Sequence, residues 1–261
     1  MLKPETAIDS WRKWDIRLST RPTPAGALGG GRSNSSYLLA SGERRMVLRI
    51  NGPDTALPGR DRTCEGRIWQ AARAAGISPR LLYADPGGAF LVSAFVENQL
   101  TGRPQDVAHL ADKALQLLQR CHQLDVDAPV IDYSAHIDRY WQLIDDHGIS
   151  FDPALAAQRR PMDAVLERLC SAGAEKGLCH HDPVAENFVG SPEKLYLIDW
   201  EYAARGSVVM DYAAFAVEWS IETALICDRT GIETEFLTTA MDFYRYQCRL
   251  WEAITQASHC S

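Results

Sequence analysis

The chain has 261 residues, of which 46% are hydrophobic and 23% are charged, as in an ordinary globular protein. Its formal net charge of −7 argues against a nucleic-acid partner, which needs a basic face, and is compatible with a small cationic substrate. The seven cysteines are scattered without a C-x-x-C pair, so we expect reduced thiols. The N-terminus lacks the apolar core of a secretion signal, and no apolar run could cross a bilayer, which predicts a cytoplasmic protein with no membrane partner.

The first hundred residues predict a mainly antiparallel sheet with one helix. The alternating segment 15–20 is expected to be a strand, and the glycine-rich segment 26–36 a flexible polar loop. One hairpin is predicted from strands at 37–40 and 46–50, and a second from strands at 80–84 and 89–96. Between the hairpins, segment 61–75 predicts a helix that ends at Gly76 and the Ser78-Pro79 pair.

After residue 104 the apolar residues recur at helical steps. Helices are predicted around 107–121, with Asp106 as the N-cap, and around 137–144, 162–169, 209–226 and 232–257. Short strands at 178–203 interrupt this series. We therefore predict an α+β fold with two lobes. A small N-terminal antiparallel β lobe with one main helix spans 1–97, and a larger, mostly helical C-terminal lobe spans 98–261.

The segment from 178 to 203 carries the strongest chemical signal. It places Asp182 and Asn187 on one loop, and Asp199 follows a short apolar strand. Phosphoryl transfer uses such a set, because the first acid orients or deprotonates a hydroxyl, while an amide and a second acid hold magnesium on a nucleotide's phosphates. His180 is interpreted as a structural residue, and His181 is equally consistent with a solvent-facing one.

Two upstream features could bind phosphate. The glycines of loop 29–34 would let backbone N–H groups approach phosphate oxygens, although a plain hairpin loop is an equal alternative. Arg49, near the end of the next strand, could contact two phosphate oxygens with its planar fork, and Glu65 is its candidate ion-pair partner. The alternative for Arg49 is a surface ion pair.

Acidic and aromatic residues follow the central segment. Glu201 and the Glu218-Trp219 pair could bind a cation through carboxylates and an aromatic face. Tyr212, Phe215 and Trp219 also fall at helical spacing, so packing in a core is the equal alternative. Asp211 is expected to brace the loop.

With these motifs, the chain resembles the aminoglycoside phosphotransferase/choline kinase superfamily. It is most similar to the bacterial choline/ethanolamine kinase-like branch, which also holds thiamine kinases. The resemblance extends from about residue 28 to 219 and rests on GGRSNSSY (30–37), VLRING (47–52), RTCE (62–65), HHDPVAEN (180–187) and LIDWEYA (197–203). It implies a bilobal protein-kinase-like fold that uses ATP and magnesium to phosphorylate a small molecule's hydroxyl.

The resemblance also implies a role for each matching position. Asp182 would be the catalytic base, and Asn187 and Asp199 the magnesium ligands. The nucleotide would contact Gly30, Gly31, Ser33, Asn34, Arg49, Glu65 and, where a strand leads into the adenine-binding hinge, Val96. Glu201, Glu218 and Trp219 would bind a cationic acceptor. Position 49 departs from the pattern, because relatives usually carry lysine there.

The expected acceptor is choline or ethanolamine, with thiamine as the second candidate and an aminoglycoside as the third. All three are cations, so charge does not separate them. A nucleotide-binding homologue without catalysis is the hypothesis from a different functional class, and the arginine at position 49 is the feature that could support it.

Overall fold

The computed structural model describes residues 2–29, 34–52, 62–98, 100, 104–171 and 175–259; the side chains of 104–109 and 257–259 lie outside the description. The chain forms two compact units. The first comprises Met1–Ala56, Asp61–Thr101 and Glu186–Glu201, and the second comprises Leu57–Arg60, Gly102–Ala185 and Tyr202–Ser261. The first unit thus includes segment 186–201, which the boundary expected at residue 97 places in the other lobe. Among the described helices, none has the length and apolar character to span a membrane.

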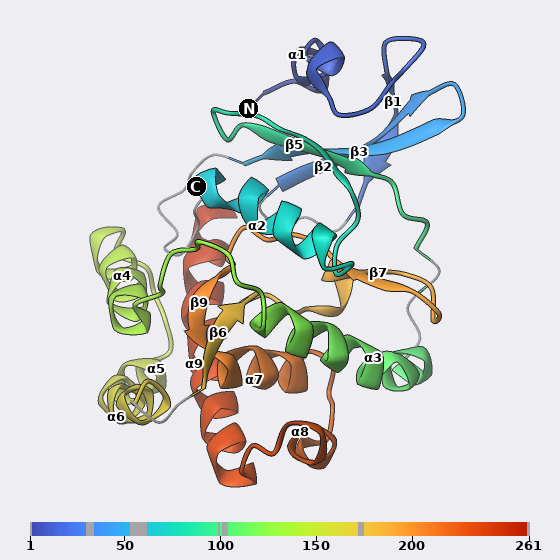
Figure 1. Ribbon diagram of the computed structural model, residues 1–261. Coiled ribbons are helices and arrows are strands. Elements are labelled where there is room, and N and C mark those ends of the chain that lie inside the picture. The colour runs from blue at the N-terminus through green and yellow to red at the C-terminus, as the bar shows by residue number, and fades with distance from the viewer. Residues whose placement is uncertain are drawn as a thin grey trace. The chain divides into compact units, whose positions relative to one another are not determined.

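The first unit is built on a five-stranded antiparallel sheet in the order β1-β2-β3-β5-β4 (Figure 1). Its elements are α1 (Pro4–Ile8), η1 (Trp11–Lys13), β1 (Thr23–Leu28), β2 (Asn34–Ser41), β3 (Arg44–Asn51), α2 (Arg62–Ala74), β4 (Leu81–Ala84), β5 (Phe90–Ala94), β7 (Phe188–Gly190) and β8 (Leu195–Leu197). Strands β7 and β8 form a separate antiparallel hairpin. A short 3₁₀ helix, η2 (Ala185–Asn187), precedes this hairpin.

The turns of the first unit agree with the sequence prediction. Both predicted hairpins and the helix between them are present. Gly42 connects β2 to β3 with a φ of 58°, and Gly76 follows α2 with a φ of 70°, a left-handed backbone that glycine adopts without a steric penalty. Residues from β2, β3, β4 and β5 pack with α1 in one apolar core that includes Ile8, Leu48 and Val92. This core fixes β3, the strand that carries Arg49.

The prediction of a strand at 15–20 is wrong. That segment has no strand structure, and the edge strand β1 lies instead at Thr23–Leu28. Ile16 and Leu18 are partly buried against the core, which explains their alternation with polar residues. Alternation reports which side chains are covered, and it does not show whether the backbone pairs with a neighbouring strand.

The second unit is mainly helical (Figure 1). Its elements are α3 (Pro104–His122), α4 (Tyr133–Asp146), α5 (Pro153–Ala157), α6 (Arg159–Leu169), β6 (Lys176–Cys179), β9 (Ala204–Ser207), α7 (Val208–Glu218), α8 (Thr223–Thr230) and α9 (Thr234–His259). The long helix α9 contacts α4, α6, α7 and α8. Strands β6 and β9 pair antiparallel, and β6 contacts both α3 and α7. These contacts place the loop after β6 next to α7.

Two helix predictions differ from the structure. The helix expected at 209–226 is divided into α7 and α8, because the backbone at Ser220 turns left-handed with a φ of 52°. Asp106 is not an N-cap, since α3 already begins at Pro104. Proline is favoured in the first turn of a helix, where its missing N–H has no intrahelical partner to lose.

Candidate active site

The first unit surrounds Arg49 with acids. Arg49 lies on β3, and its Nη2 is 2.5 Å from Oε2 of Glu65 on α2, so the ion pair expected from the sequence is present. Its Nη1 is 2.5 Å from Oδ1 of Asp199, and its Nε donates to Oδ1 of Asn51. Burial alone would lower the pKa of Arg49, but Glu65 and Asp199 raise it, so the guanidinium stays charged. Arg49 is therefore a fixed cation held between two carboxylates.

A second arginine, Arg62, lies at the start of α2 and was given no role in the sequence interpretation. Its Nη1 forms an ion pair with Oε2 of Glu201, and its Nη2 donates to Oδ1 of Asn34 at 3.1 Å. Asn34 in turn donates from Nδ2 to Oε2 of Glu201 at 2.9 Å. The side chain of Glu201 is only 4% exposed. In this buried position its carboxylate has a cation, Arg62, and an amide, Asn34, as partners.

The β7–β8 hairpin carries both predicted metal ligands. Asn187 precedes β7 and Asp199 follows β8, and the N–H of Ile198 donates to the carbonyl oxygen of Asn187 at 2.9 Å. Trp200, the residue after Asp199, is held in place because its Nε1 donates to Oγ of Ser78 at 2.8 Å. The two predicted ligand residues thus flank the two paired strands of one hairpin.

The carboxylate of Asp199 is the accessible member of the acidic group. Its side chain is 27% exposed, against 1% for Glu65 and 4% for Glu201. Burial raises its pKa to about 6, aided by the charges of Glu201 and Glu65 and opposed by Arg49. An amide oxygen and a carboxylate are hard oxygen ligands of the kind that Mg²⁺ prefers, so the donor set of Asn187 and Asp199 fits magnesium.

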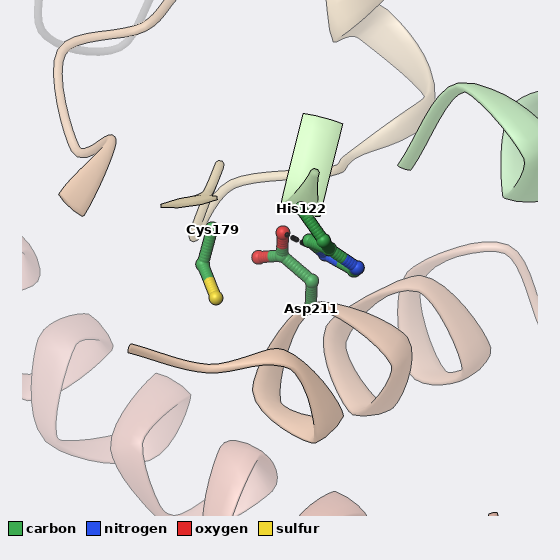
Figure 2. A group of neighbouring side chains, drawn as sticks. All are labelled: His122, Cys179 and Asp211. Carbon is green, nitrogen blue, oxygen red and sulfur yellow. Dashed lines mark hydrogen bonds and ion pairs between the residues drawn. The ribbon is translucent and has the colours of Figure 1, made fainter. Parts of the chain in front are cut away.

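In the second unit, Asp211 holds the loop that precedes Asp182. Asp211 lies in the first turn of α7 and is fully buried. Its Oδ2 accepts the backbone N–H of His180 at 2.8 Å, and its Oδ1 accepts that of His181 at 2.7 Å. Nε2 of His122, at the end of α3, lies 2.9 Å from Oδ2 (Figure 2). The bracing role expected for Asp211 therefore matches the contacts.

The charge of Asp211 is stabilised by these donors. Burial alone would raise the pKa of Asp211, but the hydrogen bond and charge of His122, together with His181 and His180, lower it to about 2. A carboxylate cannot donate, so His122 donates through Nε2. Its Nδ1 lies 3.2 Å from the hydroxyl of Tyr212. Asp211 is thus a permanent anion inside the second unit.

Cys179, His122 and Asp211 also form a possible metal-ligand group, with their ligand atoms within 4.8 Å of one another (Figure 2). Both oxygens of Asp211 already accept hydrogen bonds. Burial, with the charge of Asp211, raises the pKa of the Cys179 thiol well above its usual value, which disfavours the thiolate. The group is better explained as the support of the loop.

His181 is a second support, and not a solvent-facing side chain. Its Nε2 lies 2.8 Å from the hydroxyl of Tyr133 on α4, and its Nδ1 lies 3.2 Å from the carbonyl oxygen of Tyr202. Since the Nδ1 partner is a carbonyl, Nδ1 donates and Nε2 accepts the tyrosine proton. The backbone of His181 is left-handed, with a φ of 63°, as is that of Asp199, with a φ of 67°. The loop therefore turns sharply just before Asp182.

Asp182 is partly buried and shares its surroundings with α9. The negative charges of Glu218, Glu252 and Asp182 act on the Cys248 thiol of α9. Burial is the main cause that raises the pKa of Cys248 to about 11; these charges add to the increase, and a hydrogen bond with Tyr244 opposes it. The hydroxyl of Tyr244 donates to Oε1 of Glu218 at 2.8 Å. The charges of three carboxylates thus act on the same thiol of α9.

The three predicted acceptor residues belong to different units and differ in burial. Glu201 is buried in the first unit. In the second unit Glu218 is exposed, whereas Trp219 is buried against Phe215, with ring centroids 4.9 Å apart. Nε1 of Trp219 donates to the carbonyl oxygen of Pro183 at 3.0 Å, so Trp219 holds the loop residue that follows Asp182.

The predicted nucleotide residues are only partly described. Asn34 begins β2, and Val96 lies two residues beyond β5 and is partly buried. Gly30, Gly31 and Ser33 lie outside the described residues. Sequence reasoning gave no role to Arg62, His122 or Tyr244, since their partners are distant in the chain. For Arg62, the RTCE motif (62–65) was the available signal.

Comparison with known proteins assigns the chain to a family. The model of the phosphotransferase enzyme family matches residues 25–245, most of the chain, so the chain belongs to that family. Within it, the chain is a small-molecule kinase of the aminoglycoside phosphotransferase/choline kinase superfamily, with a protein-kinase-like α+β fold.

Individual relatives agree with this assignment. Thiamine kinase from Salmonella typhi is 27% identical over 233 residues, which cover 87% of this chain and 77% of that protein. A choline/ethanolamine kinase family protein from Mesorhizobium loti has a TM-score of 0.75 at 20% identity, covering 98% of this chain and 87% of its own. Choline kinase LicA from Streptococcus pneumoniae, in complex with AMP, has a TM-score of 0.78 at 21% identity; the match covers 97% of this chain and 90% of LicA.

Proposed function

We propose that this protein transfers the γ-phosphate of ATP to the hydroxyl of a small cationic alcohol. The observation that carries the proposal is the guanidinium of Arg49, held between Glu65 and Asp199 at 2.5 Å from each. A buried cation beside an accessible acid provides, in one place, a partner for phosphate oxygens and a ligand for the metal that accompanies them.

On the nucleotide side, Arg49 would contact phosphate oxygens while Glu65 keeps its fork oriented. Asn34 and the glycine loop before it would contact the phosphates, and Val96 would lie at the adenine. Asn187 and Asp199 would hold Mg²⁺, which when bound neutralises charge on the phosphates. ATP, magnesium and a cytoplasmic location, where both are abundant, are parts of the same proposal.

On the acceptor side, Asp182 would accept or orient the proton of the attacking hydroxyl. The hydroxyl oxygen then forms a bond to the γ-phosphorus as the bond to the ADP oxygen breaks, and the proton passes to the Asp182 carboxylate. The brace formed by Asp211 and the two histidine N–H groups would keep Asp182 in place. Only four residues separate Asp182 from Asn187 in the chain.

The charge around α9 favours a cation as the acceptor. Glu218 and Glu252 share the neighbourhood of Cys248 with Asp182, and the aromatic side chain of Tyr244 contacts Glu218. Carboxylates and an aromatic face together bind an ammonium or a thiazolium well, with each contact contributing about 0.5–2 kcal/mol. Glu201 is assigned to the nucleotide side instead, because Arg62 already neutralises it.

Thiamine and choline both satisfy this description, since each joins a permanent cation to a primary hydroxyethyl group. Thiamine kinase is a relative that matches by sequence over most of the chain, which favours thiamine as the first acceptor to test. Choline or ethanolamine is the second, because the acidic residues around α9 suit a compact ammonium equally well. An aminoglycoside is the third.

The test is a panel assay with the purified chain, ATP and magnesium. ADP release is measured with thiamine, choline, ethanolamine and an aminoglycoside, and the phosphorylated product is identified by mass spectrometry. The proposal expects release that depends on one cationic alcohol and is lost in Asp182→Asn. Tight ATP binding without acceptor-dependent release would contradict it in favour of a nucleotide-binding protein.

A further inference from the structure

Arg62 connects two segments that the sequence separates widely. Its Nη2 donates to Asn34, the first residue of β2, and its Nη1 pairs with Glu201, two residues beyond Asp199. Asn34 and Glu201 also bond each other, although they lie 167 residues apart in the chain. The three side chains form a closed triangle in which each member contacts both others.

We infer that Arg62 is a positioning residue for the nucleotide, because it ties Asn34, the first residue of β2, to the segment that carries Asp199. The inference rests on the proposed use of ATP, and it assigns Glu201 to that same site. Within the triangle, Oε2 of Glu201 meets both Arg62 and Asn34, so this oxygen is directed toward the nucleotide residues. A single planar guanidinium can reach an amide oxygen and a carboxylate at once, which an ammonium cannot do with the same geometry.

The surroundings of Arg62 show that it is held from several sides. Its side chain is 12% exposed, and Nη1 also lies 3.6 Å from Oε2 of Glu65, the partner of Arg49. Oδ1 of Asn34 accepts the N–H of Gly52 at 3.3 Å, next to Asn51 at the end of β3. Arg62 therefore contacts the start of β2 directly, the end of β3 through Asn34, and the carboxylate that orients Arg49.

This arrangement predicts a separation between the two substrates. If Arg62 positions Asn34 and the Asp199 segment, its loss weakens nucleotide binding and leaves acceptor binding unchanged. Arg62→Gln keeps an amide that can bond Asn34 but removes the charge from Glu201. Glu201→Gln removes the same ion pair from the other side. Both variants should then weaken nucleotide binding and leave acceptor binding unchanged.

The experiment measures the dissociation constant of a non-hydrolysable ATP analogue with Mg²⁺ by calorimetry. It also measures KM for ATP and for the acceptor found active. Arg62→Gln and Glu201→Gln are each expected to raise the nucleotide constants about tenfold or more, as for loss of a charged hydrogen bond, with acceptor KM within about twofold. Arg62→Lys should recover part of the affinity. Arg80→Gln, which removes an exposed ion pair to Asp15 in the same unit, is the matched control and should change neither.

Several outcomes would overturn the inference. A raised acceptor KM in Glu201→Gln with unchanged nucleotide affinity would return Glu201 to the acceptor site. Equal losses for both substrates, or a lowered melting temperature without a change in nucleotide affinity, would make Arg62 a purely structural residue. If Arg62→Gln does not fold, Arg62→Lys and Asn34→Ser give the same comparison. Failure of the wild-type chain to bind the ATP analogue would contradict the proposed function itself.

Discussion

The two units hold their candidate site acids by different means. In the first unit, the acids Glu65, Asp199 and Glu201 are each paired with a guanidinium. In the second unit, Asp211 is held by two backbone N–H groups and an imidazole, and Glu218 by a tyrosine hydroxyl. One half is neutralised by fixed charges and the other mainly by hydrogen-bond donors.

The proposed function would account for this difference, with the nucleotide in the first unit and the acceptor in the second. A polyanionic nucleotide needs cations that remain charged at every physiological pH, which arginine provides. A cationic acceptor needs acids whose negative field is not cancelled, and neutral donors stabilise a carboxylate without adding a positive charge. Kinetic variants can test whether the two units act separately, and stability variants can test how each unit holds its charged groups; the largest expected effect comes first.

Asp182→Asn should have the largest effect, and only on the acceptor half. We expect kcat to fall by about 10²–10⁴-fold, because the amide cannot take the hydroxyl proton. The dissociation constant of ATP should stay within about twofold, since the nucleotide residues are all in the other unit. Steady-state kinetics and calorimetry measure the two quantities. Asp163→Asn, an exposed acid on α6, is the control, and a matching loss of ATP affinity would show that the halves are not separate.

Asp211→Ala should destabilise the second unit. It leaves the N–H groups of His180 and His181 and the ring of His122 without their acceptor, all in a buried environment. We expect the free energy of unfolding to fall by about 3–5 kcal/mol. Urea denaturation measures the change, and Asp242→Ala on the surface of α9 should stay within about 0.5 kcal/mol of wild type. A loss below about 1 kcal/mol would mean that the donors find water instead.

Stability should depend on pH through a buried histidine of the second unit. His136 lies on α4 with neither ring nitrogen hydrogen-bonded among the described residues. Burial, and then the charge of His181, lower its pKa from 6.5 to about 4. As the pH falls from 6.5 to 4, His136 therefore becomes protonated in the unfolded chain but stays neutral in the folded chain. The unfolding free energy should decrease by about 3 kcal/mol over this range. Above pH 6.5 His136 is neutral in both states, so the protein should keep its full stability there.

The control for this pH effect is His136→Leu, which has a similar volume and no titrating group. Its unfolding free energy, measured by urea denaturation at several pH values, should vary less between pH 6.5 and 4 than that of wild type. An identical slope in both proteins would assign the pH dependence to other groups.

Tyr244→Phe should have a moderate effect confined to the acceptor. The substitution removes the hydroxyl that donates to Glu218 but keeps the ring. We expect KM for the acceptor to rise by about tenfold, because one hydrogen bond to a charged group contributes about 1.5 kcal/mol. KM for ATP should not change. Kinetics with each substrate varied in turn would show this, and a change in ATP KM alone would contradict it.

The exposed ion pair of Arg168 and Glu235 should have the smallest effect. Its side chains are 52% and 78% exposed, so water and salt screen the attraction. Glu235→Gln should change the unfolding free energy by less than about 1 kcal/mol. Denaturation at low and high salt provides the measurement. A larger, salt-independent loss would mean that surface pairs cannot serve as a reference for the buried ones.

The sequence predicted the local features of this site better than its distant contacts. The ion pair of Arg49 and Glu65 could be foreseen from the strand–helix order, and the brace role of Asp211 from its place after the central segment. The pairing of Arg62 with Glu201 could not, because it depends on how β7 and β8 join the first unit. Glu201 was accordingly interpreted as an acceptor ligand from its aromatic neighbours in the chain.

The fold shows the same limit. Glycine turns marked the hairpins and the end of α2, since a left-handed backbone requires particular residues. The break between α7 and α8 occurs at Ser220, a residue type that gives no such signal. The edge strand β1 contains Pro24 and Gly26, which are poor strand formers that an edge tolerates, so its pattern was hidden.

The left-handed backbone of Asp199 limits which substitutions this position can accept. Aspartate, asparagine and glycine adopt that conformation readily, whereas a longer acid does so less easily. Exchanging Asp199 for glutamate would keep the charge and still disturb the chain, so it is not the conservative change that its chemistry suggests. The variants open to evolution or design at this point are therefore decided by backbone geometry before ligand chemistry, and His181, with the same conformation, is subject to the same limit.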